Sequence, residues 1–169
     1  MARHITITLE QRGVSCTARL LDDAAPRTAS AVWEALPLTA PVFHGKYARN
    51  EIYALFPQFA DRDPGRENTT ITPIPGDVCW FTFAGDDLGN PAYGYEAEEQ
   101  HRAADRAIID LAVFYGRNNL LINGDQGWVP GNVFAEITEG LAEMAAACQD
   151  VWMGGARGET LTFARAQEG

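Results

Sequence analysis

Arg49, Glu51 and Tyr53 are the residues of this chain whose types and spacing point most directly to chemistry. They lie in the stretch Val42 to Phe59, VFHGKYARNEIYALFPQF, where apolar and aromatic residues alternate with polar ones. Successive side chains of a β-strand point to opposite faces, so these three would share one face and set a cation, a carboxylate and a phenol in a row. Such a row is either part of a ligand site or an ion pair on the surface of a strand.

A second polar group follows the apolar run that ends at Tyr115. Arg117 and Asn118 come directly after this run, and Trp128 lies in the segment beyond them. Arginine pairs with carboxylates, amides fix the orientation of a ligand, and aromatic rings form apolar walls. The alternative is that Arg117 and the pair Asn118-Asn119 satisfy backbone groups in a turn, because Asn adopts turn conformations readily. The first interpretation predicts one ligand-binding pocket made by Arg49, Glu51, Tyr53, Tyr115, Arg117, Asn118 and Trp128.

That pocket would take a small anionic organic molecule or a peptide terminus. Arg49 and Arg117 would bind the anion, Glu51 and Asn118 would orient the ligand, and the aromatic residues would form the walls. His44 has no Ser or Cys placed beside it for nucleophilic work, so we interpret it as a half-buried strand residue and assign no catalytic residue.

The run EAEEQH, from Glu96 to His101, brings carboxylates and an imidazole together. It has no recognised spacing of metal ligands, and charge runs of this kind usually form a solvated surface. We therefore predict neither a metal nor a cofactor. The three cysteines, Cys16, Cys79 and Cys148, are widely separated and are expected to be buried, reduced thiols.

The composition excludes several classes of partner. The chain has 169 residues, 46% hydrophobic and 21% charged, which fits one globular domain over residues 1–169. Its net charge of −10 and its pI near 4.6 repel nucleic acids and anionic membranes, so we expect neither as a partner. There is no apolar run long enough for a membrane helix and no signal-peptide pattern at the N-terminus, so a cytoplasmic protein is expected.

The apolar pattern predicts a chain built mostly of strands. Helical spacing is found over Pro26–Leu36, where Asp22 and Asp23 at the entry would complement the helix dipole. Residues 84–106 are interpreted as a loop with a short helix over Glu98–Arg106. Alternating or continuous apolar runs predict strands over Ile5–Glu10, Val14–Leu21, Val78–Phe83 and Ile108–Tyr115.

Several segments resemble cyclophilins. RLLDDAAPRTASAVWEALPL is similar to the second strand and first helix of that family, and GETLTFARA is similar to its last strand. Periodicity alone would allow VFAEITEGLAEMAAACQDVW to be one helix, but the resemblance implies a strand at Val133–Thr138 and a helix at about Leu141–Trp152. The implied fold is mostly β, a closed antiparallel cyclophilin-like β-barrel of about eight strands with two capping helices.

EIYALFP, PGDVCWF and LAVFYGRNN resemble more narrowly an uncharacterised bacterial group of cyclophilin-like proteins of unknown function. Cyclophilins isomerise prolyl peptide bonds with the arginine of a Phe-His-Arg motif and a Gln-Gly-Gly-Asp segment. Here Phe43-His44 is followed by Gly45, and the second motif is missing. We therefore place a ligand pocket at a barrel mouth and expect no significant prolyl isomerase activity.

Two alternative functions stay open at this point. The resemblance allows a peptidyl-prolyl cis-trans isomerase, with Arg49 in place of the missing guanidinium. The four tryptophans allow a structural or partner-binding protein that forms a homodimer through exposed aromatic rings. Trp128, beside Gly127 and Pro130, is the tryptophan expected at a pocket or interface.

Overall fold

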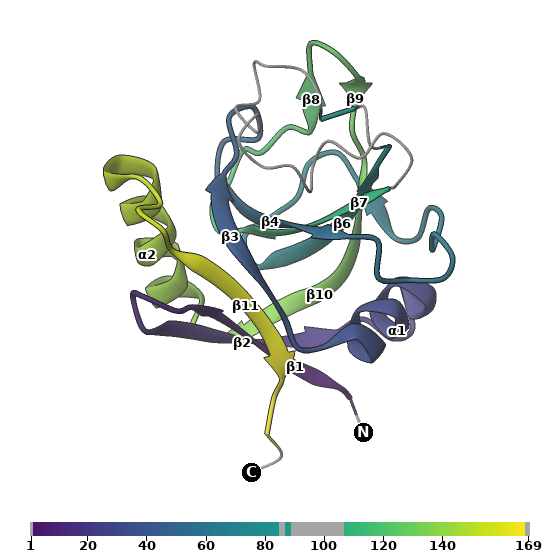
Figure 1. The fold of residues 1–169 in the computed structure, drawn as a ribbon, viewed down its shortest axis with the longest axis horizontal. Coiled ribbons are helices and arrows are strands. Elements are labelled where there is room, and N and C mark those ends of the chain that lie inside the picture. The colour runs from purple at the N-terminus through teal and green to yellow at the C-terminus, as the bar shows by residue number, and fades with distance from the viewer. Residues whose placement is uncertain (1, 85–86, 89–106, 168–169) are drawn as a thin grey trace.

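Eight strands form a closed antiparallel barrel in the computed structural model, which describes residues 2–84, 87–88 and 107–167. Strand β10 pairs with β2 and so closes the ring (Figure 1). In order around the barrel the strands are β2 (Val14–Leu20), β1 (His4–Leu9), β11 (Thr160–Arg165), β3 (Leu38–His44), β4 (Glu51–Pro57), β7 (Ile108–Phe114), β6 (Asp77–Phe83) and β10 (Gly131–Glu139).

Two helices and three two-residue strands complete the described elements. Helix α1 (Pro26–Ala35) and helix α2 (Leu141–Gly154) lie on different sides of the barrel in Figure 1. Strand β5 (Thr69–Thr70) pairs with β10, while β8 (Ile122–Asn123) and β9 (Gly127–Trp128) form a separate small hairpin. Neither described helix is long and apolar enough to cross a membrane.

The predicted fold class is confirmed: the structure is mostly strands, with a closed eight-stranded barrel and two helices. The strand and helix expected over Val133–Thr138 and Leu141–Trp152 are both present, as β10 and α2. The expected helix near Glu98–Arg106 lies outside the described residues. The three cysteines are free and buried, as expected.

The barrel is filled by the side chains that alternate inward along its strands. Ile52, Ala54 and Phe56 of β4 belong to the same buried cluster as residues of both helices, such as Val32 and Met144. An amphipathic helix must cover its apolar face, and both helices do so against this interior.

The opposite, outward faces of β4, β7 and β6 are also covered. Cys79, Phe81, Ala112 and Phe114 alternate with the interior residues and form a second buried cluster with Leu121. Every residue of β7 is buried, as its continuous apolar run predicts for a strand covered on both faces. This outer layer is where the site described below lies.

The N-terminus of helix α1 is capped by a carboxylate from a loop that is distant in the sequence. Ala25, at the N-cap, makes no side-chain capping bond, and no acidic residue lies in the first turn; Asp22 and Asp23 precede the helix. Asp22 instead forms an ion pair with Arg3. Local sequence rules assume that a cap comes from a neighbouring residue, and here it does not.

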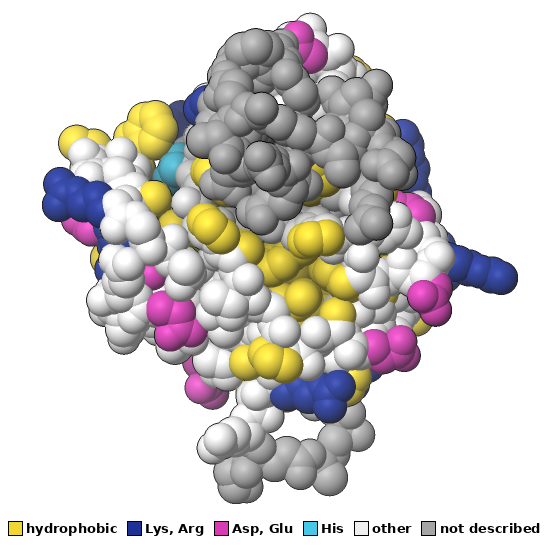
Figure 2. All heavy atoms as spheres, viewed as in Figure 1, with side chains coloured by type: hydrophobic (Ala, Val, Ile, Leu, Met, Phe, Trp, Pro, Cys, Tyr) yellow, Lys and Arg dark blue, Asp and Glu magenta, His cyan; other side chains and the backbone are white. Residues whose placement is uncertain are grey.

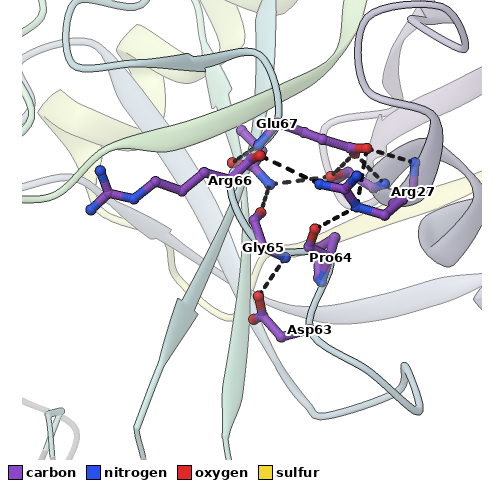
Figure 3. A network of polar contacts seen from close by, with 8 residues as sticks. Arg27, Asp63, Pro64, Gly65, Arg66 and Glu67 are labelled. Atoms are coloured by element: carbon purple, nitrogen blue, oxygen red, sulfur yellow. Dashed lines mark hydrogen bonds and ion pairs between the residues drawn. The ribbon is translucent and has the colours of Figure 1, made fainter.

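Glu67 supplies the missing cap (Figure 3). Its Oε1 accepts a hydrogen bond from the backbone N–H of Arg27 at 3.1 Å, and its Oε2 accepts bonds from the N–H and the hydroxyl of Thr28, both at 2.8 Å. Asn132 Nδ2 donates to the Thr28 hydroxyl at 3.2 Å, and Asn132 Oδ1 accepts from the Glu67 N–H. This network, which we call the Glu67 clamp, fastens α1, the 63–67 loop and β10 together.

Charged side chains are dispersed over the face of the molecule seen in Figure 2. On the face seen in Figure 2, Lys and Arg side chains lie apart from one another, and apolar side chains gather between the regions of β3 and α1. The described part of this face therefore offers no basic patch of the kind that binds a nucleic-acid backbone.

Candidate functional site

A pocket lies against the outer face of β4, β7 and β6, between the 45–48 connection and the β8–β9 hairpin. It has a volume of about 100 Å³. Its apolar walls come mainly from Leu55, Phe81, Phe83, Leu88, Leu121 and Val129. Its polar lining comes from Lys46, Glu51, Tyr53, Asp110, Asn123 and Gln126.

Glu51 and Asp110 place two carboxyl groups in this otherwise apolar layer. Glu51 is 8% exposed and Asp110 is 6% exposed. Asp110 lies on β7 with Leu55 on one side and Phe81 on the other as its cross-strand neighbours, so neither neighbour can donate a hydrogen bond from its side chain. Its Oδ1 atom is buried and has no hydrogen-bond partner in the described part of the chain.

Burial controls the protonation of this pair. It raises the pKa of Glu51 to about 8. Burial also raises the pKa of Asp110 well above its usual range, and the nearby charge of Glu51 raises it further. At pH 7 the Glu51 carboxyl is therefore mostly protonated, and the raised pKa of Asp110 favours its protonated form as well. A protonated carboxyl can donate one hydrogen bond and still accept others, and a bound cation favours its ionised form, which only accepts.

Gly45 makes room for the Glu51 carboxyl. A Cβ atom on Gly45 would lie 2.5 Å from Oε2 of Glu51, a distance that forces a shift. The Gly45 N–H donates to the Glu51 carbonyl at 2.8 Å, which holds the two backbones together at the start of β4. A residue with any side chain at position 45 would push the carboxyl out of its place.

The expected row of Arg49, Glu51 and Tyr53 on one strand is partly wrong. The stretch Val42–Phe59 contains a hairpin, since β3 ends at His44 and β4 begins only at Glu51. Glu51 and Tyr53 share the outer face of β4 and both line the pocket. Arg49 lies before the strand, in the exposed connection, and is not among the lining residues. The strand periodicity applied to Arg49 does not hold across a turn.

Arg117 and Asn118 lie in an exposed turn after β7, and neither lines the pocket. The turn nevertheless lies beside Asn50, the residue after Arg49: Asn50 Nδ2 donates a hydrogen bond to the Arg117 carbonyl at 2.8 Å. Asn119 also connects this turn to neighbouring segments. Its Oδ1 accepts a hydrogen bond from the Asn50 N–H at 3.0 Å, and its Nδ2 donates to the carbonyl of Pro73. Asn119 is thus a buried anchor of the turn.

Tyr115 is buried and turns away from the pocket into the barrel interior. Its hydroxyl lies 2.6 Å from Nε2 of His44, whose ring also packs 4.7 Å from that of Trp152. His44 is half-buried, as expected, and burial lowers its pKa even though the Gly45 carbonyl acts in the opposite direction.

Trp128 is 57% exposed on the β8–β9 hairpin. It lines a second hollow next to the pocket, and the two hollows share Phe81, Phe83, Gln126 and Val129. Of the seven residues predicted for one site, the structure therefore brings Glu51 and Tyr53 into the pocket and sets Trp128 at its edge.

The family model for a protein of unknown function, DUF3830, matches residues 7–163. The chain belongs to the DUF3830 family. No curated protein matches this DUF3830 chain.

Solved structures share the fold of this DUF3830 protein. A structure of McbB in complex with tryptophan matches with a TM-score of 0.59 and 17% identity; the match covers 98% of this chain and 45% of the McbB chain. A hypothetical protein from Archaeoglobus fulgidus, AF2241, matches with a TM-score of 0.52 and 22% identity over 98% of this chain and 95% of its own. The Mimivirus cyclophilin matches with a TM-score of 0.49 and 11% identity, and the match covers 97% of this chain and 87% of the cyclophilin chain. At these identities the matches with McbB and AF2241 show a shared fold and nothing beyond it.

Sequence reasoning missed Asp110, Lys46 and the aromatic floor formed by Phe81 and Phe83. Asp110 could have been recognised from the sequence, because it is the single charged residue in the apolar run IIDLAVF. The acidic run from Glu96 to His101 falls outside the described residues, and the residues that are described contain no cluster of three or more side chains suited to a metal ion.

Proposed function

We propose that this DUF3830 protein binds a small organic molecule in the outer-face pocket and has no prolyl isomerase activity of consequence. The observation that carries the proposal is the buried, unpartnered Oδ1 of Asp110, a residue that lines the cavity. A buried polar atom without a partner costs about 1–3 kcal/mol. A ligand that donates a hydrogen bond to this oxygen removes that cost, and the free energy of binding becomes more favourable by a corresponding amount.

The walls suit an apolar or aromatic ligand body. Phe81 and Phe83 lie nearly parallel, with ring centroids 6.3 Å apart, and Tyr53 is stacked against Phe43 at 5.5 Å. A closed cavity of roughly 150 Å³ holds benzene. The volume of about 100 Å³ found here is smaller, so the pocket takes a short alkyl chain or part of one ring, with the rest of the ligand reaching out through the opening.

The lining favours a ligand without a negative charge over the anion that the sequence predicts. Arg49 and Arg117, the proposed anion-binding groups, are exposed outside this pocket, and its lining carries two carboxyls for the one amine of Lys46. An anion would hold both carboxyls in their protonated form and would raise the energy of any carboxyl that ionised beside it.

Gly45 supports the absence of isomerase activity. Cyclophilins carry the arginine of their Phe-His-Arg motif at the corresponding position. Here even a Cβ atom would collide with the Glu51 carboxyl, so a guanidinium at this position is incompatible with the pocket. A protease-coupled assay on a prolyl peptide is expected to show no rate above the uncatalysed one, and a rate that is lost in an Arg49→Ala variant would contradict this part of the proposal.

Protein NMR with 2-phenylethanol, a neutral ring with one hydroxyl, tests the binding proposal. We expect saturable shifts of the backbone amides of β4, β6 and β7. A Val129→Trp variant should lose them, because the larger ring fills the pocket that Val129 lines. An Ile74→Trp variant adds the same ring at a position that is 64% exposed and outside the lining, and it should retain them. Equal shifts in both variants, or none in the wild type, would count against the pocket.

A further inference from the structure

We propose that the pocket selects ligands that carry a primary ammonium group, held between the carboxyls of Glu51 and Asp110. This inference rests on the proposed function, because it names the class of molecule that the same pocket takes. It differs from the anion predicted from the sequence, and it goes beyond the binding of an uncharged ring.

The two carboxyls approach one space from neighbouring strands. Asp110 is the cross-strand partner of Leu55, and Glu51 is the partner of Phe114, so their backbones are offset by four residues, roughly 13 Å at about 3.3 Å per residue. Ala112 is the residue of β7 between these two positions, on the same outer face. Its cross-strand partner Tyr53 lines the cavity together with both carboxyls, and the charge of Glu51 acts on Asp110, so the two carboxyls share one space.

An ammonium group fits this arrangement because it has three donors and no acceptor. One donor satisfies the unpartnered Oδ1 of Asp110, and another is available to Glu51. An alcohol has one donor and a carboxylate has none, so neither can serve both residues as a donor. Hydrogen bonds between charged groups are also about twice as strong as those between neutral ones.

The other titratable groups around the pair leave the site acidic. Lys46 lies at the exposed rim, while Tyr53 and the buried thiol of Cys79 face the same layer from β4 and β6. Burial raises the pKa of Cys79, so the thiol is uncharged. The protein's net charge of −10 attracts cations from solution and raises their local concentration at such an opening.

Proton release accompanies binding in this scheme. The empty pair holds two protons near neutral pH, because burial keeps the pKa values of both carboxyls high. A bound R–NH₃⁺ favours the ionised form of one carboxyl, which passes its proton to solvent. The balance is R–NH₃⁺ plus two carboxylic acids giving the complex of R–NH₃⁺ with one carboxylate and one acid, plus H⁺. Affinity therefore rises with pH between 6 and about 8.

Calorimetry with three ligands of one size tests the inference: 2-phenylethylamine, 2-phenylethanol and 3-phenylpropionate. Each is titrated into the full-length protein at pH 7 in two buffers with different enthalpies of ionisation, which gives the number of protons released. Asp110→Asn and Glu51→Gln remove one carboxyl each at nearly constant shape. Glu34→Gln removes the same charge from an exposed position on α1 and serves as the matched control.

The inference is supported if the amine binds about tenfold or more tightly than the alcohol and releases a proton, and if either carboxyl variant removes that preference while Glu34→Gln does not. Equal binding of amine and alcohol without proton release would overturn the amine class and leave the pocket standing. Binding of none of the three would overturn both. Wild-type proton release decides the matter even if a variant does not fold.

Discussion

Replacing Glu67 with glutamine tests how helix α1 is held to the barrel. The change keeps the size of the side chain but removes its charge and converts one acceptor oxygen to a donor. The remaining amide oxygen can still accept from the N–H and hydroxyl of Thr28. In the wild type, the backbone N–H of Arg27 donates to Oε1 of Glu67 at 3.1 Å. In the variant, the amide nitrogen replaces this oxygen, so two donors face each other inside a network that is almost fully buried.

The magnitude follows from what is lost. Removal of a helix cap costs about 0.5–2 kcal/mol, and a hydrogen bond to a charged group contributes about 1.5–3 kcal/mol. Since glutamine keeps part of the cap, we expect Glu67→Gln to lower the free energy of unfolding by about 2 kcal/mol at pH 7, with a fall in Tm of roughly 4–8 °C for a chain of this length. Glu67→Ala removes all three acceptor contacts and should cost about 3–4 kcal/mol.

Urea unfolding followed by circular dichroism at pH 7 and at about pH 3.5 gives the measurement. Burial alone raises the pKa of Glu67, but the bonds from Thr28 and Arg27 and the charge of Arg27 outweigh it, so the pKa lies below its ordinary value. A depressed pKa means that the stabilisation is present above the unfolded-state value near 4.3 and is lost as the pH falls through the folded-state value. The gap between wild type and variant should therefore narrow in acid.

Glu34→Gln, on the exposed side of the same helix, controls for the loss of one negative charge and should stay within about 0.5 kcal/mol of wild type. The reasoning is refuted if Glu67→Gln also stays within that range at pH 7, or if its deficit does not shrink at low pH.

Two further predictions concern the pocket. The pKa of Glu51 is about 8 in the folded state and about 4.3 in the unfolded state, so the free energy of unfolding of the wild type should fall as the pH rises from 5 to 8. Relative to the wild type, Glu51→Gln should therefore be more stable at pH 7.5 than at pH 5, by about 1–3 kcal/mol. An equal difference between variant and wild type at the two pH values, measured by urea unfolding, would contradict this. Gly45→Ala should displace the Glu51 carboxyl, lower stability by about 1–3 kcal/mol and weaken 2-phenylethylamine binding by calorimetry, whereas Gly124→Ala, where a Cβ meets nothing within 4 Å, should change neither.

The barrel could be predicted because most of its strands carry their own signal. The run IIDLAVF is apolar on both faces, and β7 is buried on both faces; ITITL alternates, and β1 is buried on one. The segment from Val133 to Trp152 shows what periodicity cannot do. Its apolar residues satisfy a continuous helix, and the break falls at Gly140, which adopts a φ of 79°. A Cβ there would lie 2.9 Å from the carbonyl oxygen of Ser15, so close packing against β2 fixes the break.

The site was less predictable because it depends on which strand lies beside which. Glu51 was identified from its type and from its phase with Tyr53, and both belong to one strand. Asp110 is 59 positions further along, and only the pairing of β4 with β7 brings it to the same cavity. The phase argument failed at Arg49 because a turn separates β3 from β4, and no alternation is preserved across it. Glu67 likewise caps a helix that begins 41 positions earlier.

The closed ring of strands also limits how this protein can recognise other chains. Each of the eight barrel strands has a paired neighbour on both sides, so within the described residues their backbones expose no long row of free N–H and C=O groups. An extended peptide therefore finds no barrel strand with a whole free edge among the described residues, although many domains read extended sequences by pairing with such an edge. Within the described residues, the same pairing leaves no complete barrel strand open to edge-to-edge association with a second copy.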